Sequence, residues 1–457
     1  MDFTPHAGTP ARPRPLRFLE EARLEACGYA LAIIYAVIFV HLYRAGSWIL
    51  DIAGAPVYTD FATIWVAGIE AVRGEAARLY DSAQFLKIQA QLLGTRPFFY
   101  PNWPYPPIML LIAAPFGALP YLYAFLSWDI LTLAALLIVV YRIVPRPSAI
   151  PLVLASPFTA WNFLAGQNGF LTGSLLGAAL LCLQRRPVLA GIFIGCLSYK
   201  PQFGILLPVA LIAARQWRAI ASAAVTVVAL AGLSAAAFGI GAWEMLPTGL
   251  LAQKNVVLLA SGAADADANW GHIQTIYGLV RELHGGGVFA TLLHCAGALA
   301  VAVIVWRVWR SSASYDLKAA AVSAAALIAT PYAFSYDMAA LAIPVAFVAR
   351  DQLRDGLLRR EQATLLALFG IVLTAFGAFW VNQDNFDFGR MPLGLIALVT
   401  VMFLIMRRAA IPVFSKNVNG HSRRDSRPRE GFEPAVRRNE DDAFRDRPVR
   451  RLRHLTP

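Results

Sequence analysis

Long apolar runs recur along almost the whole chain, and they constrain its fold more than any other feature. Hydrophobic residues make up 58% of the 457 residues and charged residues only 15%, a composition that excludes a soluble fold. The runs are long enough to cross a bilayer and lack the strict alternation of barrel strands. Because a backbone in lipid must satisfy its own hydrogen bonds, we predict an all-α polytopic membrane protein.

The basic residues predict the topology of this protein. The formal net charge is +12, and the excess lies beside the apolar runs and in the last forty or so residues. This is typical of cytoplasmic loops that face anionic lipid, so we expect no nucleic-acid partner. With the basic clusters inside, three stretches become hairpins whose apices face outward. Each apex combines a helix-breaking Gly or Pro with polar groups: "GQNG" (166–169), "YKPQ" (199–202) and "TPYAFSYD" (330–337).

The apolar stretch 106–120 does not cross in this topology, because a crossing there would move the later arginine clusters outside. We place it at the outer interface, anchored by nearby aromatic residues that include Trp103 and Tyr105. The result is a bundle of about twelve membrane helices with large extracytoplasmic loops and both termini inside. Its segments are a cytoplasmic N-terminal part (1–25), a membrane domain (26–410) and a disordered basic tail (411–457).

The hairpin arms predict where the apices lie. An arm of about 13 residues spans roughly 20 Å as a helix, against about 30 Å of hydrocarbon. The apices should therefore end below the outer surface. Irregular backbone at that depth is tolerated only where protein buries it or a wet cavity exposes it, so we expect a cavity near the outer leaflet.

One acid, Asp60, follows the first membrane segment in "VYTDFATIWVAG" (57–68). Apolar residues recur after it at helical spacing, which predicts an amphipathic helix that lies on the membrane. Asp60 has two interpretations. It caps the N-terminus of that helix, or it is a functional acid at the outer face.

The first two apices carry further candidates. Lys200 lies too deep in its hairpin for a lysine that reaches the interface, so it needs an anionic partner, either a ligand phosphate or an outer-loop acid. Gln167 and Asn168 are able to donate hydrogen bonds to a sugar or a phosphate. The same two residues would also suit a capped re-entrant turn.

The outer loops add residues with equally open interpretations. His272 and Gln274 lie beside Trp270, whose ring offers a stacking face for a sugar, although a lone histidine there is also a common solvated loop residue. Asp337 is either a charge favoured by a helix N-terminus or a cavity residue.

Three more candidates for substrate binding complete the set. Arg390 stands alone in the last outer loop, where it either binds a ligand or a lipid headgroup. The tyrosines Tyr105 and Tyr336 belong to the aromatic cluster and to the third apex, respectively.

An ordered series of motifs resembles glycosyltransferase family 87, membrane enzymes of the GT-C fold that include phosphatidylinositol mannoside mannosyltransferases. The series is "TDFATIWVAG", "GEAARLYD", "YPNWPYPP", "GQNGFLTGSLLGAALL", "YKPQFGILLPVAL" and "TPYAFSYDMAAL", over roughly 58–350. The resemblance implies transfer of a sugar, mannose-like, from a polyprenyl phosphate sugar to a glycolipid or glycan of the cell envelope. It also implies a base in the first outer loop, where Asp60 stands.

These expectations agree with the requirements of sugar transfer. A lipid phosphate leaving group is already activated, so the reaction requires a base for the acceptor hydroxyl and donors for the phosphate. Asp60 and Lys200 would supply both at the extracytoplasmic side of the inner membrane, without a cofactor or a metal ion. A transporter or lipid flippase is the alternative, and it predicts two related halves, which this sequence lacks. A structural scaffold would explain the loops but not Lys200.

Overall fold

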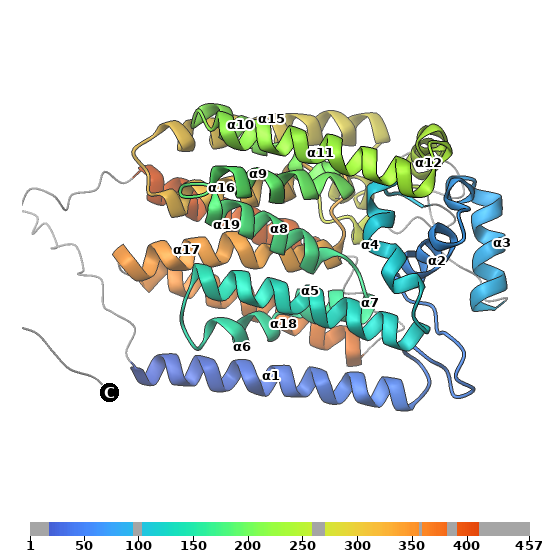
Figure 1. Cartoon of the computed structure of the whole chain (residues 1–457). Coiled ribbons are helices and arrows are strands. Elements are labelled where there is room, and N and C mark those ends of the chain that lie inside the picture. Colours follow the sequence, from blue (N-terminus) through green and yellow to red (C-terminus); the bar gives the residue numbers. More distant parts are fainter. Residues whose placement is uncertain (1–17, 95–102, 258–269, 356–358, 382–390, 411–457) are drawn as a thin grey trace, which may run out of the picture. The chain divides into compact units, whose positions relative to one another are not determined.

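The computed structural model describes residues 18–94, 103–257, 270–355, 359–381 and 391–410, and these ranges are mostly helical with no β-strand. Four helices are long and apolar enough to cross a membrane: α1 (Phe18–Arg44), α5 (Tyr121–Ile143), α11 (Trp217–Phe238) and α15 (Gly287–Arg310). They run lengthwise through one bundle together with α18 (Arg359–Val381) and α19 (Leu393–Ala410) (Figure 1). The all-α class is confirmed, whereas the twelve crossings stay a prediction.

The three predicted hairpins are present as pairs of shorter helices. The first joins α6 (Ala149–Leu154) and α7 (Pro157–Ala165) to α8 (Gly169–Cys182). The second joins α9 (Pro187–Cys196) to α10 (Leu207–Ala213) through the short turns η2 (Leu197–Tyr199) and η3 (Pro201–Gly204). The third joins α16 (Tyr315–Ala329) to η5 (Ser335–Leu341) and α17 (Ala342–Asp355). In Figure 1, α8 and α9 end before α1 and α5 do, as the short arms predict.

The first apex depends on a glycine. Gly166 has a φ of +67°, a backbone conformation that a side chain disfavours. A Cβ atom there would lie 2.6 Å from Phe61 and 2.6 Å from Phe125. The close approach of these two rings therefore needs glycine at the point where α7 turns into α8.

A separate layer of short helices covers one end of the bundle: α2 (Phe61–Val72), η1 (Ala76–Tyr80), α3 (Ser82–Leu93) and α4 (Ile108–Gly117). Ten residues of α4 span only about 15 Å, too little to cross the bilayer, so its placement outside the spans agrees with its length. Helices α2 and α4 cross with their backbones in contact at Gly68 and Gly117. Farther along the chain, α12 (Gly241–Val257) packs on η1, and η4 (Trp270–His272) leads into α14 (Ile276–Glu282).

Two expectations for this layer are wrong. Most of α2 is buried, including Phe61, Ile64 and Val66, so it is not a helix lying on the membrane surface. Trp103 and Tyr105 are buried as well, and they are part of the core rather than an interfacial anchor. In both cases α4 and its neighbours supply a protein surface that the sequence pattern does not reveal.

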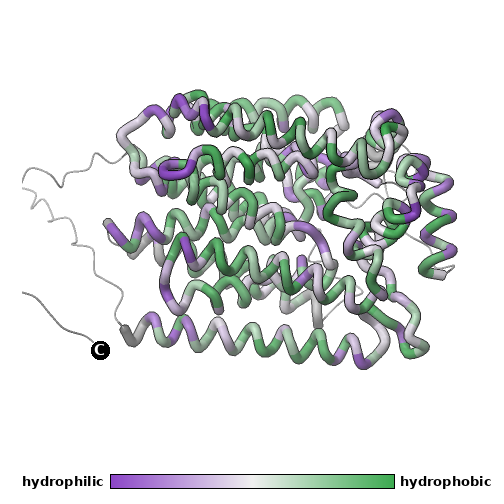
Figure 2. The backbone as a smooth tube through the Cα atoms, in the orientation of Figure 1, coloured by the Kyte–Doolittle hydropathy of each residue, from purple (hydrophilic) through white to green (hydrophobic). Residues whose placement is uncertain are grey.

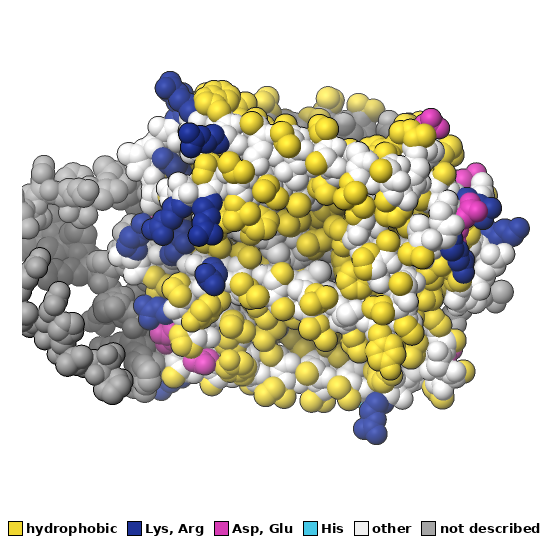
Figure 3. Space-filling model, in the orientation of Figure 1, with side chains coloured by type: hydrophobic (Ala, Val, Ile, Leu, Met, Phe, Trp, Pro, Cys, Tyr) yellow, Lys and Arg dark blue, Asp and Glu magenta, His cyan; other side chains and the backbone are white. Residues whose placement is uncertain are grey.

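The two ends of the bundle differ in charge. We call the end with α2, α3 and the three apices the apex end, and the opposite end the basic end. Arginines that end or follow helices gather at the basic end, among them Arg142, Arg186, Arg215, Arg310 and Arg408. Figure 2 shows hydrophobic backbone between the ends, and Figure 3 shows Lys and Arg concentrated at one of them. This distribution agrees with the basic clusters that define the topology.

Candidate active site

The three hairpin apices meet at one buried lysine. Lys200 Nζ, in the second apex, lies 2.9 Å from Asn168 Oδ1 of the first apex and 2.6 Å from Asp337 Oδ1 of the third. Lys200 is only 4% exposed, and Asp337 and Asn168 are fully buried. The partner of Lys200 in the structure is therefore an acid, Asp337, and it comes from another apex. Of the two partners that the sequence suggested, a ligand phosphate or an outer-loop acid, this resembles the second. Protein buries these three apex side chains, and the cavity expected near the outer leaflet stays a prediction.

Further contacts hold this ion pair in place. The ammonium of Lys200 lies 5.1 Å from the ring centre of Phe203 and 5.3 Å from that of Tyr336. The second oxygen of Asp337 accepts a hydrogen bond from the backbone N–H of Phe334, at 3.0 Å. Removing one partner of such a buried pair typically costs about 3–5 kcal/mol, because the other charge is left uncompensated.

Asp60 lies at the start of α2, about halfway between buried and exposed. Its side chain makes no capping hydrogen bond to α2, so the structure does not support the N-cap interpretation. Instead its Oδ2 accepts a hydrogen bond from Nε2 of Gln167 at 3.3 Å. Burial raises the pKa of Asp60 to about 6, against the opposing effects of Gln167, His272 and Lys200. A carboxylate with that pKa is suited to take up a proton near neutral pH.

Tyr105 completes a connection between Asp60 and the apices. Its hydroxyl lies 3.5 Å from Oε1 of Gln167 and 2.7 Å from Nδ2 of Asn168. Tyr105 was expected to bind substrate, and here it bridges the two polar side chains of the first apex. Six of the predicted site residues thus form one connected polar group, drawn from segments far apart in the sequence: Asp60, Tyr105, Gln167, Asn168, Lys200 and Asp337.

His272 and Gln274 have different surroundings from each other. The ring of His272 stacks on Trp161 of α7, with ring centres 6.4 Å apart, and its charge influences Asp60. Gln274 is buried, and its amide bonds the carbonyl of Met391 at 2.8 Å and the backbone N–H of Gly394 at 2.8 Å. Gln274 therefore links this loop to the start of α19.

Trp270 does not offer the open stacking face that the sequence suggested. It is 5% exposed, with the guanidinium of Arg281 4.6 Å from its ring centre and Tyr277 at its edge. Arg390 lies outside the described residues.

Two residues near the site were not singled out from the sequence. Trp161 gave no signal, because a tryptophan in an apolar helix resembles any core residue. Asp129 of α5 is fully buried, and neither of its carboxylate oxygens has a hydrogen-bond partner within the described part of the chain. A carboxyl inside a predicted span is itself a functional signal in a sequence, and Asp129 carries that signal.

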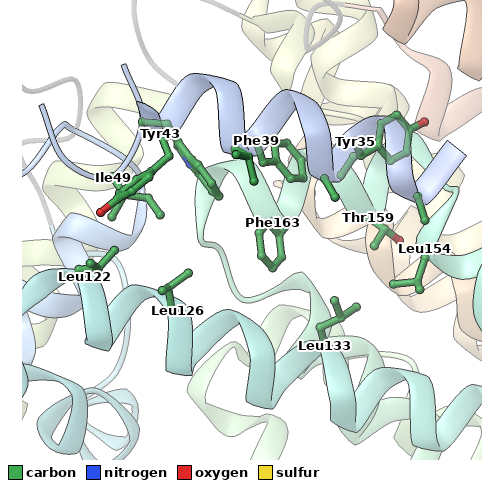
Figure 4. A pocket seen from close by; sticks show the side chains of 15 residues that line it. Tyr35, Phe39, Tyr43, Ile49, Leu122, Leu126, Leu133, Leu154, Thr159 and Phe163 are labelled. Atoms are coloured by element: carbon green, nitrogen blue, oxygen red, sulfur yellow. The ribbon is translucent and has the colours of Figure 1, made fainter. Parts of the chain in front are cut away.

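An apolar groove of about 460 Å³ lies beside the site, between α1, α5 and α7 (Figure 4). Tyr35, Phe39, Leu126, Leu133 and Phe163 are among its lining residues. At its apex end the groove reaches Trp48, whose ring lies 5.5 Å from that of Phe125. Phe125 in turn lies 5.4 Å from Phe61, the neighbour of Asp60. The groove and Asp60 are thus separated by a thin wall of aromatic rings.

Within the described ranges, no three His, Cys, Asp or Glu side chains are grouped so that they would hold a metal ion. The model of glycosyltransferase family 87 matches residues 103–335, about half of the chain. This range includes Tyr105, the first two apices and His272, while Asp60 and Asp337 lie outside it. No curated protein and no solved structure matches the chain.

Proposed function

Because this chain belongs to glycosyltransferase family 87, we propose that it transfers a mannose-like sugar from a polyprenyl phosphate sugar to an envelope glycolipid or glycan. The proposed site lies at the apex end, on the extracytoplasmic side of the inner membrane. This orientation is supported by the arginines at the opposite end, which are typical of a cytoplasmic face. The twelve-span GT-C-like topology is part of the same proposal.

The observation that carries the proposal is the hydrogen bonding of the Asp60 carboxylate together with its raised pKa. Gln167 bonds Oδ2, and no other described side chain or backbone N–H bonds the carboxylate, so Oδ1 is available to an acceptor hydroxyl. With a pKa of about 6, Asp60 is mostly ionised at neutral pH and still basic enough to accept a proton. An acid that merely capped α2 would need neither a free carboxylate oxygen nor a raised pKa.

The reaction then proceeds as a substitution at the anomeric carbon. Asp60 takes the proton of the acceptor hydroxyl, and the oxygen of that hydroxyl forms a bond to the anomeric carbon. The bond from the carbon to the phosphate oxygen breaks, and the polyprenyl phosphate leaves with the electron pair. Positive charge near the phosphate favours this departure.

Lys200 is the proposed source of that charge. An ammonium has three N–H donors, and the described residues use two of them. Its third donor is able to serve a phosphate oxygen. Asn168, Tyr336 and Asp337 contact the ammonium directly and would shape this subsite, and His272, Gln274 and Arg390 are proposed for the sugar or acceptor side.

The apolar groove supports a donor with a lipid chain. It is lined by apolar side chains of α1 and α5, whose outward residues such as Ile33 and Leu131 are exposed on the bundle surface, where the bilayer would lie. Its inner end stops at the ring layer next to Phe61, so a chain in the groove would bring its headgroup toward Asp60. A transporter would use intramembrane charges too, but it does not require an apolar groove whose inner end lies near a half-buried carboxylate.

The experiment is a transfer assay with purified protein in proteoliposomes. The protein is incubated with a panel of polyprenyl phosphate sugars and an envelope lipid extract, and free polyprenyl phosphate is measured. We expect acceptor-dependent release from one donor with the native protein and almost none with Asp60→Asn. Movement of an intact donor across the bilayer without release would instead establish the transporter.

A further inference from the structure

Four hydrogen bonds join Lys200 to Asp60, and all four point the same way. Lys200 donates to Oδ1 of Asn168 at 2.9 Å, and Nδ2 of Asn168 donates to the hydroxyl of Tyr105 at 2.7 Å. Tyr105 donates to Oε1 of Gln167 at 3.5 Å, and Nε2 of Gln167 donates to Oδ2 of Asp60 at 3.3 Å. We call this series the apex chain. It begins at a cation and ends at an anion.

The chemistry of its two ends fixes this direction. An ammonium only donates and a carboxylate only accepts, so the amide of Asn168 must turn its oxygen toward Lys200. The Asn168 amide nitrogen then faces Tyr105, which passes its own proton on to Gln167. A separate bond fixes the amide of Gln167, because the backbone N–H of Asn168 donates to the same Oε1 at 3.2 Å. Both orientations thus follow from the bonds and are not arbitrary.

We propose that Gln167, Asn168 and Tyr105 are positioning residues, which hold Asp60 by one oxygen and make its orientation and basicity depend on Lys200. The proposal rests on the proposed function only in taking Asp60 as the base. It changes the role of the three residues: they act through Asp60 rather than by touching the sugar.

The alignment of the apex chain has a physical consequence. Hydrogen bonds in series polarise one another, so each N–H or O–H nearer to Asp60 becomes a better donor. The last donor, Gln167, therefore stabilises the ionised form of Asp60 more than an isolated amide would. Removing any one hydrogen bond of the apex chain should raise the pKa of Asp60 and let its carboxylate rotate.

Other groups also act on Asp60 and must stay constant in a test. His272 and Lys200 lower its pKa by their charge, and burial raises it. Tyr121 lies close enough to interact with it and bonds Thr59 at 2.8 Å. The variants below leave all four of these side chains in place.

Tyr105→Phe is the decisive variant, and Tyr199→Phe is its matched control. Both remove one buried hydroxyl near the first apex, but the hydroxyl of Tyr199 bonds Thr172 at 2.6 Å and the backbone carbonyl of Asn168 at 3.4 Å, outside the apex chain. The protonation of Asp60 is followed by difference infrared spectroscopy of the full chain, with the carboxyl band assigned by its loss in Asp60→Asn. This readout needs no substrate.

We expect Tyr105→Phe to raise the pKa of Asp60 by several tenths, and Gln167→Met, which removes the final donor, to raise it by about 1. Tyr199→Phe should leave it unchanged. In the transfer assay, kcat should fall about tenfold for Gln167→Met with little change in KM, because a misdirected base affects only the reacting step. A structural role alone would not shift the titration.

Equal titrations for Tyr105→Phe, Gln167→Met and native protein would overturn the proposal. Equal shifts in the pKa of Asp60 for Tyr105→Phe and Tyr199→Phe would also overturn it, because the shift would then not depend on the hydrogen bonds of the apex chain. Failure of the proposed function has a different result, namely normal transfer by Asp60→Asn. The infrared titration still decides the apex chain in that case.

Discussion

Two of the buried charge clusters in the described part of the chain lie at opposite ends of the bundle, and they are built differently. At the basic end, Arg408 of α19 bonds Asp351 of α17 at 2.9 Å and Glu361 of α18 at 2.7 Å. At the apex end, Lys200 meets one carboxylate and a neutral amide. The arginine cluster is closed, because several charged bonds saturate it. The lysine cluster continues through neutral side chains to Asp60, which is half-buried and open on one oxygen.

The difference teaches how to separate a structural cluster from a functional one. A guanidinium with two carboxylates presents no remaining partner to a ligand and fixes three helices. A lysine with one carboxylate retains donor capacity, and its charge is transmitted toward a group that a substrate is able to reach. Substitution of Asp60 should therefore reduce activity more than stability, whereas substitution of Arg408 should reduce stability more than activity.

The largest expected effect is the loss of turnover in Asp60→Asn. A positioned base contributes about two to four orders of magnitude in rate, so transfer should fall by that much. Stability should not fall with it. The pKa of Asp60 is raised from 3.8 to about 6 in the folded protein, so ionised Asp60 opposes folding increasingly as pH rises through that range. Asparagine removes this effect at pH 7.

Transfer assays and thermal unfolding of the same preparation measure both quantities. Near-normal transfer by Asp60→Asn would move the search for a base to Asp337 and to Asp81. The latter precedes α3 and accepts a hydrogen bond from the backbone N–H of Gln84 at 2.9 Å.

The second prediction concerns the basic end. Arg408→Met leaves Asp351 and Glu361 buried without their cation, which should destabilise the protein by about 3–5 kcal/mol. The fraction that remains folded should transfer sugar at the native rate. Denaturant unfolding and kcat per folded molecule check the two statements. A lower kcat in the folded fraction would mean that this cluster is coupled to the site.

The third prediction tests Lys200 against its own structural role. Lys200→Met alone should be as unstable as Arg408→Met, because it leaves the carboxylate of Asp337 buried without its cation. The double variant Lys200→Met/Asp337→Asn removes both charges and should recover most of the stability. Donor affinity should remain about ten- to a hundredfold weaker, as expected for a lost charged hydrogen bond. If donor affinity returns together with stability, the phosphate is held elsewhere.

The sequence predicted the parts of the site better than their arrangement. Helix breakers between short apolar arms indicated the apices, and the cost of charge in lipid indicated Lys200. The pairing of Lys200 with Asp337, 137 positions away, is a tertiary contact that no local pattern contains. Tyr105 was misread for the same reason: an aromatic residue near the membrane surface looks like an anchor until another helix covers it.

The fourth prediction is a pH profile. Transfer requires ionised Asp60, so kcat should rise with pH through an acid limb near 6, where the pKa of this carboxyl lies. The limb should be tenfold per pH unit at its steepest, since one proton is lost. The Arg408 cluster does not contact Asp60, and the surviving folded fraction of Arg408→Met should keep the same limb. A flat profile between pH 5 and 8 would exclude Asp60 as the titrating base.

The smallest effect is expected in the apolar groove. Leu126→Trp places a larger side chain in the groove, and Leu131→Trp places one on the exposed, opposite side of α5 as a control. A lipid chain in the bilayer is already out of water, so the groove contributes packing contacts rather than a hydrophobic gain. We therefore expect only about a two- to tenfold rise in KM for long-chain donors with Leu126→Trp. A donor with one or two isoprene units should be unaffected, because it does not extend into the groove. Equal losses for short and long donors would show that the substitution distorts the site. The polyprenyl chain of the donor would then lie along another face of the protein.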